Sequence, residues 1–169
     1  MITPAWVEQM ARYSRWMNQK LYAHAATLSD EQRKADRGAF FKSLHNTLDH
    51  LVWADIIWLG RFTGNQPALP VAGSILYPDF NELRAKREAL DAEMESWVAS
   101  VDEKFLAAPF SWTSRISNKT LTRPAWVLVS HFFNHQTHHR GQVTTLLSQY
   151  GIDPGVTDLW AMPESDNLL

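Results

Sequence analysis

The sequence predicts an all-α fold, a four-helix bundle with long connections between its helices. Four long segments carry apolar residues at the spacing of amphipathic helices, and residues that favour helix starts precede them. The chain has 169 residues, enough for one domain with its own hydrophobic core, so we expect residues 1–169 to form a single domain. It contains no cysteine, which excludes a disulfide framework, a thiolate metal site and a cysteine nucleophile.

The first predicted helix begins at Thr3 and Pro4. Threonine caps helix N-termini, and proline is favoured at the first helical position. Apolar residues then recur every three to four positions, which predicts a helix to about Leu28. Residues 29–32 predict a short helical turn after it.

The second predicted helix begins near Phe41 or Ser43 and ends at Phe62. It is apolar on more than one face, a pattern typical of a helix buried in a bundle, and one that also suits a subunit contact. Residues 64–74 are rich in glycine and proline and predict a loop.

The third predicted helix begins at Asp79, which lies three residues before a glutamate in a capping-box-like pattern. It should run to about Val101 with one charged face. Residues 109–122 change character and predict a small β-hairpin or an extended loop. The fourth helix should start at Pro124 and last until Gly151, and the rest of the chain is expected to be mostly irregular.

Charge and hydropathy exclude two classes of partner. The net charge is −2 and there is no basic stripe, so we expect no nucleic-acid partner. No stretch approaches the roughly 18–20 uninterrupted apolar residues of a membrane span, so we expect no membrane partner. Residues 1–8 lack the basic and apolar regions of a signal peptide. The expected location is the cytoplasm.

Four of the seven histidines lie in the fourth predicted helix, and three of them share one broad face. His131, His135 and His139 are spaced by four residues, which rotates each about 40° from the last. Neighbouring imidazoles can therefore hold one metal ion, and either neighbouring pair could chelate it. A third ligand must come from elsewhere. His50 is the best candidate, although the residues alone also permit His45, about 140° away around the second helix.

A site of three neutral imidazoles leaves coordination positions open, which is typical of catalytic rather than structural zinc sites. Zinc is the first expectation, with nickel beside it, and cobalt, manganese or iron would also suit nitrogen and oxygen ligands. Such an ion can activate bound water or a thiolate, so we expect a small-molecule substrate.

Two motifs of this sequence resemble the DinB family of damage-inducible bacterial proteins. One lies on the second predicted helix, at residues 48–50, 54–55 and 58–59, and the other is the His-x-x-x-His-Arg-Gly-Gln element within residues 134–142. The likeness extends over nearly the whole chain. Further matching residues are Tyr13, Trp16, Asn18, Trp112, Thr113, Pro124, Tyr150–Gly155 and Asp158.

The resemblance implies a DinB/YfiT-like four-helix bundle with unusual connectivity. It also implies a divalent metal ion held by His50 on the second helix and by His135 and His139 on the fourth. Proteins that share this fold include thiol-dependent S-transferases and mycothiol-dependent maleylpyruvate isomerase, while many DinB members have no established activity. Homodimers are common among similar proteins, so a homodimer is expected here.

Two functions are therefore compared. The first is a divalent-metal-dependent enzyme, a thiol S-transferase or a hydrolase acting on a small molecule, with a low-molecular-weight thiol as a candidate cosubstrate. The catalytic group would be a metal-bound water or thiolate. The alternative is a non-enzymatic metal-binding protein with a stress-response or interaction role.

Several residues near the histidines are candidates for the second shell or for a substrate pocket. Asp55 could accept a hydrogen bond from a metal-bound imidazole, although a plain acceptor or a solvated role is an equal alternative. Gln142, three residues after His139, could orient that ligand. Trp58 could line a pocket, and His131 and His138 are candidates for the second shell or the pocket rim.

Gly141 lies in the middle of the fourth predicted helix, two residues after His139. Glycine costs about 1 kcal/mol relative to alanine at such a position. We therefore expect a packing reason for it, namely the close approach of a neighbouring helix near the site.

Overall fold

The fold is described from a computed structural model of residues 1–71, 73–114 and 118–163. In that part of the chain the protein is mostly helical, with six α-helices and one two-stranded antiparallel sheet. The predominantly helical class and the small hairpin before the last helix are thereby confirmed.

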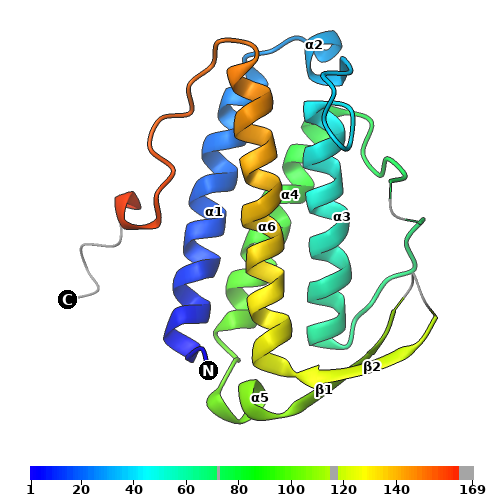
Figure 1. Cartoon of the computed structure of the whole chain (residues 1–169), viewed down its shortest axis with the longest axis vertical. Coiled ribbons are helices and arrows are strands. Elements are labelled where there is room, and N and C mark those ends of the chain that lie inside the picture. Colours follow the sequence, from blue (N-terminus) through cyan, green and yellow to red (C-terminus); the bar gives the residue numbers. More distant parts are fainter. Residues whose placement is uncertain (72, 115–117, 164–169) are drawn as a thin grey trace.

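Four long helices lie side by side along the long axis of the molecule (Figure 1). α1 and α3 each pack against both α4 and α6. The buried apolar residues of all four helices form one continuous core. The four helices are α1 (Pro4–Ala26), α3 (Leu44–Thr63), α4 (Phe80–Val98) and α6 (Ala125–Ser148).

The predicted helix starts are confirmed by their capping hydrogen bonds. Thr3 accepts from the backbone N–H of Trp6 before α1, and Ser43 accepts from Asn46 before α3. Asp79 accepts from two backbone N–H groups at the start of α4. Gly64 ends α3 in the left-handed conformation, with φ of 75°, which glycine adopts without steric cost.

Two short helices flank the long ones. α2 (Asp30–Lys34) confirms the predicted short helical turn, and it begins with a capping box formed by Ser29 and Gln32. α5 (Glu103–Ala107) was not predicted. The third helix was expected to reach Val101, but α4 ends at Val98 because the chain turns there and restarts at the Asp102 cap.

The predicted β-hairpin consists of β1 (Pro109–Thr113) and β2 (Thr120–Pro124), paired antiparallel with Trp112 opposite Leu121. Asn118 takes the left-handed backbone conformation with φ of 51°, so asparagine supplies what a glycine would in this turn. Residues 115–117 of the predicted segment lie outside the described residues. The hairpin leads directly into α6, which carries two of the candidate ligands (Figure 1).

The expectation that a neighbouring helix approaches closely at Gly141 was wrong. A Cβ built on Gly141 meets nothing within 4 Å, so no neighbouring helix approaches there. The close approach occurs at Gly60 on α3, where a Cβ would lie 2.9 Å from the Cα of Gln66 in the following loop. The helical period located a glycine on α6, but the period does not say what faces it.

A buried polar network crosses the interior beside the apolar core. Arg87 on α4 pairs with Asp55 on α3 at 2.5 Å and with Asp91 at 3.0 Å, and all three side chains are about 3–4% exposed. Asn18 on α1 donates to Asp91 at 2.9 Å. The network therefore ties three of the long helices together.

In the part of the chain that the structure describes, no helix is both long and apolar enough to cross a membrane. After α6 the chain continues without long elements. Gly151, with φ of 71°, follows α6, and a short 3₁₀ helix, η1 (Leu159–Ala161), lies in the tail. Residues 164–169 of the predicted irregular tail lie outside the described residues.

Candidate metal centre

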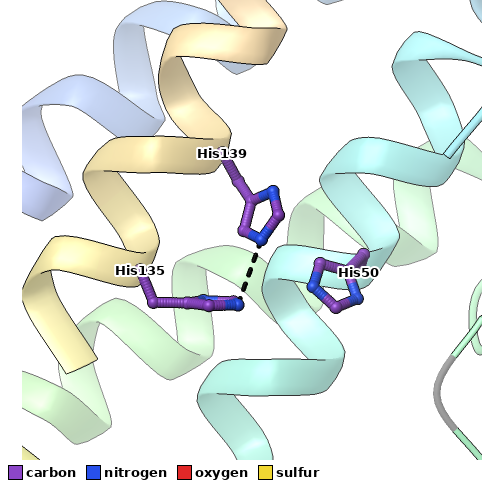
Figure 2. Close-up of side chains that lie close together, drawn as sticks. All are labelled: His50, His135 and His139. Carbon is purple, nitrogen blue, oxygen red and sulfur yellow. Dashed lines mark hydrogen bonds between the residues drawn. The ribbon is translucent and has the colours of Figure 1, made fainter. Parts of the chain in front are cut away.

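Three histidines from two helices meet between α3 and α6. His50 lies on α3, and His135 and His139 lie one turn apart on α6 (Figure 2). One ring nitrogen from each residue lies within 4.8 Å of the other two. Among the described residues, this is the group of three side chains that could hold a metal ion.

The placement of each ring follows from helix geometry. Residues four apart on a helix face the same direction, so His135 and His139 project together toward α3. On α3, Asn46, His50 and Trp53 fall at positions i, i+4 and i+7 and share one face. Because α3 and α6 are packed against each other, His50 comes opposite the two histidines of α6.

The proton of His139 is placed by its neighbour Gln142. Nδ1 of His139 lies 2.8 Å from the amide oxygen of Gln142, and the amide nitrogen of Gln142 lies 3.4 Å from Nε2 of His138. An amide oxygen only accepts, so Nδ1 of His139 carries the proton and donates it. Its Nε2 then presents a lone pair toward Nε2 of His135, which lies 3.0 Å away.

His50 is held by aromatic rings rather than by hydrogen bonds. Phe41 stacks on it, with ring centroids 3.9 Å apart and an angle of 22°, and Trp53 lies nearly parallel at 6.0 Å. Nδ1 of His50 is buried and has no hydrogen-bond partner among the described residues. A buried ring nitrogen without a partner is costly, so hydrogen bonds alone do not account for this imidazole.

Burial keeps the three imidazoles neutral. Loss of hydration lowers the pKa of His50 to about 4, and burial together with the neighbouring imidazoles lowers that of His135 to about 3. Burial also lowers the pKa of His139, while the hydrogen bond to Gln142 opposes that shift. Neutral imidazole is the form that binds metal ions, so the site presents its ligands ready at neutral pH.

The donor set fits a divalent transition-metal ion. Three imidazole nitrogens and no thiolate suit zinc, nickel, cobalt or iron. Nitrogens that share one zinc ion at about 2.1 Å are roughly 3.4 Å apart, and the Nε2 atoms of His135 and His139 lie 3.0 Å apart. Three protein ligands leave further coordination positions for water or a substrate.

A cavity of about 480 Å³ opens beside His50. Its lining includes Phe41 and Trp53, the two rings that pack on His50, and Ser74 and Ile75 from the loop before α4. Small-molecule sites have volumes of about 300–1,000 Å³ and mostly apolar walls. The cavity meets the candidate metal centre at His50, whereas His135 and His139 are not among its lining residues.

The structure places the other histidine candidates outside the three-residue group. His45, on α3, is 1% exposed and lies 2.8 Å from the backbone oxygen of Tyr77, which makes it part of the core. The ring of His131 lies 5.9 Å from that of His135 and contacts Trp58 edge to face at 5.1 Å. Trp58 thus packs beside His131 and is not among the residues that line the cavity at His50.

Asp55 lies on α3 below the cluster and pairs with Arg87 at 2.5 Å, within the buried polar network. In the described residues its carboxylate forms no hydrogen bond with a histidine, although its negative charge acts on His139 and opposes the lowering of the pKa of that imidazole. The side-chain oxygen of Gln142 lies 2.8 Å from Nδ1 of His139, the candidate ligand that Gln142 was predicted to orient.

Sequence analysis missed Phe41 and the loop side of the cavity. Phe41 precedes the Ser43 cap and touches two of the candidate ligands, with its ring 5.5 Å from that of His139 in an edge contact. Asn46 could have been found, because it shares the helix face of His50. The loop residues could not, because no periodicity links Ser74 or Ile75 to α3.

The fold and the site together define a helical protein with a candidate three-histidine metal centre beside a small-molecule cavity. The model of the DinB family matches residues 1–167, so the chain belongs to the DinB family. It is similar to the protein DinB of Bacillus subtilis (strain 168), with 26% identity over 163 residues that cover 89% of each chain.

Proposed function

We propose that this chain is a divalent-metal-dependent enzyme, a thiol S-transferase or a hydrolase, that acts on a small molecule at His50, His135 and His139. The observation that carries the proposal is the convergence of three ring nitrogens within 4.8 Å beside a cavity of about 480 Å³. A structural site would be closed by a fourth protein ligand, whereas this one has room for a reactant. The arrangement of long helices is interpreted as a DinB/YfiT-like four-helix bundle in a single domain.

In this proposal, the ion supplies a Lewis acid that activates water or a thiol. The chain supplies the geometry. Gln142 holds a proton on Nδ1 of His139 and so directs the Nε2 lone pair into the centre. Phe41 and Trp53 fix the plane of His50 and keep water from its faces. The cavity beside them orients the substrate.

A panel of reactions tests the proposal. Activated esters, lactams and pairs of a thiol with a small electrophile are offered to the protein loaded with zinc, nickel, cobalt, manganese or iron. We expect turnover in one class, abolished by His139→Ala and retained by His131→Ala. Absence of turnover in every class, with the ion demonstrably bound, would reject an enzymatic role.

A second candidate is a metal-binding interaction protein without catalysis. Phe40 is 81% exposed and Val71 75% exposed, and apolar side chains so exposed favour a contact with another macromolecule. A homodimer would be one such contact. Equilibrium sedimentation of the parent and of Val71→Ser separates this role from the enzymatic one, because Val71 does not line the cavity at His50 and loss of association need not affect metal content.

A further inference from the structure

The cavity beside the candidate metal centre is lined by both charged and apolar residues. One wall is aromatic, with Phe41, His50 and Trp53 nearly parallel in their packing. Ser74 and Ile75, from the loop before α4, also line the cavity, and Ile75 is 42% exposed. A planar, apolar body of the size of one or two fused rings suits such a slot.

Two charged residues line the cavity, Asp49 and Lys42, and only one of them is open to a ligand. Asp49 is 1% exposed, and its carboxylate accepts the backbone N–H of Leu76 at 3.0 Å and of Tyr77 at 2.8 Å. Its hydrogen-bonding capacity is therefore directed at the loop, which it fixes against α3. Lys42 is exposed and forms no ion pair with any described residue.

The backbone at Lys42 provides an independent observation. Lys42 has φ of 71°, in the left-handed region that favours glycine. Two backbone hydrogen bonds hold it there: its N–H donates to Ala39 and its carbonyl accepts from Arg37, each at 2.8 Å. A lysine in a conformation that glycine would adopt more easily suggests that the side chain has a role, since such strain concentrates at functional sites.

We propose that this cavity binds the substrate of the metal centre and that the substrate is a small organic anion with a planar apolar body, such as an aromatic carboxylate. The ring lies against Phe41 and Trp53, and the anionic group pairs with the ammonium of Lys42. Asn46, on the same helix face as His50, supplies an amide at the wall. The substrate role rests on the proposed function, whereas the binding preference is a property of the cavity alone.

Three naphthalene probes of similar size and different charge test the preference: 2-naphthoate, 2-naphthamide and 2-naphthylmethylammonium. Their dissociation constants are measured by isothermal titration calorimetry on the whole chain, before and after removal of metal by a chelator. In the metal-free protein we expect 2-naphthoate to bind about fivefold more tightly than 2-naphthamide, a ratio of the size expected for one partly exposed ion pair, and the ammonium to bind most weakly.

Four variants assign the preference to the cavity. Lys42→Met should remove the fivefold ratio and leave the affinity for 2-naphthamide unchanged, and Lys42→Arg should retain the ratio. Lys104→Met, at the exposed α5 on the opposite end of the molecule, is the matched control and should behave as the parent (Figure 1). Ile75→Ala should lower the affinity for all three probes by the same factor, because an apolar side chain contacts the naphthalene ring and does not distinguish the charged groups.

Three results would overturn the proposal: no binding of any probe, equal binding of the anion and the amide, or a ratio that survives Lys42→Met. Thermal unfolding of each variant verifies that it is folded. Failure of the metal centre would be recognised separately. If the histidine variants and the parent alike contain no metal while the naphthoate ratio holds, the proposed function fails and the cavity's preference stands.

Discussion

The Nε2 atoms of His135 and His139 lie 3.0 Å apart on successive turns of α6 (Figure 2). Gln142 accepts a hydrogen bond from the protonated Nδ1 of His139. The Nε2 of His139 is therefore unprotonated, and its lone pair faces His135. Two lone pairs at this distance repel unless a proton or a metal ion lies between them. A proton on Nε2 of His135, or a metal ion shared with His50, would remove this repulsion.

Metal content should depend on His50, His135 and His139 and not on the other two histidines of α6. We expect the purified parent to contain about one divalent ion per chain, measured by inductively coupled plasma mass spectrometry. His50→Ala, His135→Ala and His139→Ala should each lose it on dialysis against a chelator. His131→Ala and His138→Ala should retain it, because their rings lie outside the three-residue group. Retention in any of the first three would remove that residue from the ligand set.

Gln142→Ala should weaken metal binding without unfolding the protein. The substitution removes the acceptor of the His139 Nδ1 proton, and loss of such an orienting partner costs about 10–100-fold in metal affinity. Competition with a chromophoric chelator measures the change. Gln149→Ala, the same residue type at the exposed C-terminal end of α6, should bind as the parent does. Equal affinity of the two variants would contradict the orienting role.

The metal-free protein should lose stability as the pH falls from about 6.5 towards 4. The folded-state pKa of His50 is about 4 and that of His135 about 3, both below the ordinary value of 6.5. Between these values the unfolded chain binds more protons, so the free energy of unfolding decreases as the pH falls. Urea unfolding at pH 7 and pH 5 measures this change.

A variant assigns the pH effect to the cluster. His135→Gln removes one of the groups with a lowered pKa, and its stability should fall less than that of the parent between pH 7 and pH 5. Lys104→Met serves as a folded control without a change in any histidine. An unchanged pH dependence in His135→Gln would show that other groups cause the loss.

Arg87→Met should destabilise the protein by about 3–5 kcal/mol. Arg87 pairs with Asp55 and Asp91 in the interior, and its removal leaves two carboxylates buried without their cation. Arg84→Met, which breaks the exposed pair with Glu88 on the same helix, should cost less than about 1 kcal/mol. Urea unfolding compares the two. Similar costs for both variants would mean that the buried network contributes little.

Two glycine-to-alanine changes should have opposite effects. At Gly60 the new Cβ would lie 2.9 Å from the backbone of Gln66, so Gly60→Ala should destabilise although alanine favours helices. Gly141 faces open space, and Gly141→Ala should stabilise by up to about 1 kcal/mol. Thermal unfolding gives the sign of each change. A stabilising Gly60→Ala would show that the loop after α3 moves away freely.

Much of the local structure could be predicted from the sequence. The sequence predicted where the long helices begin, at the Thr3, Ser43 and Asp79 caps, and where α3 ends, at Gly64. Caps could be predicted because each one bonds to backbone groups only a few residues away. The four-residue spacing of His135 and His139 likewise placed them on one face, since one helix carries both.

The tertiary structure alone decided which residues the two helices bring together. Helical periodicity gives the angle between His45 and His50 on α3, and among His131, His135 and His139 on α6, but not which angle faces the neighbouring helix. The packing of α3 on α6 selected one residue of the first set and two of the second.

The same reason applies to Asp55 and to the cavity. The partner of Asp55 is Arg87, 32 residues later on a third helix, and the loop wall at Ile75 approaches His50 only through the folded chain. The sequence by itself determined the helices, their ends and the pair of imidazoles on α6. The position of His50 opposite that pair, the close approach at Gly60 and the cavity were decided by tertiary packing. Such packing depends on residues far apart in the chain, which no local pattern relates.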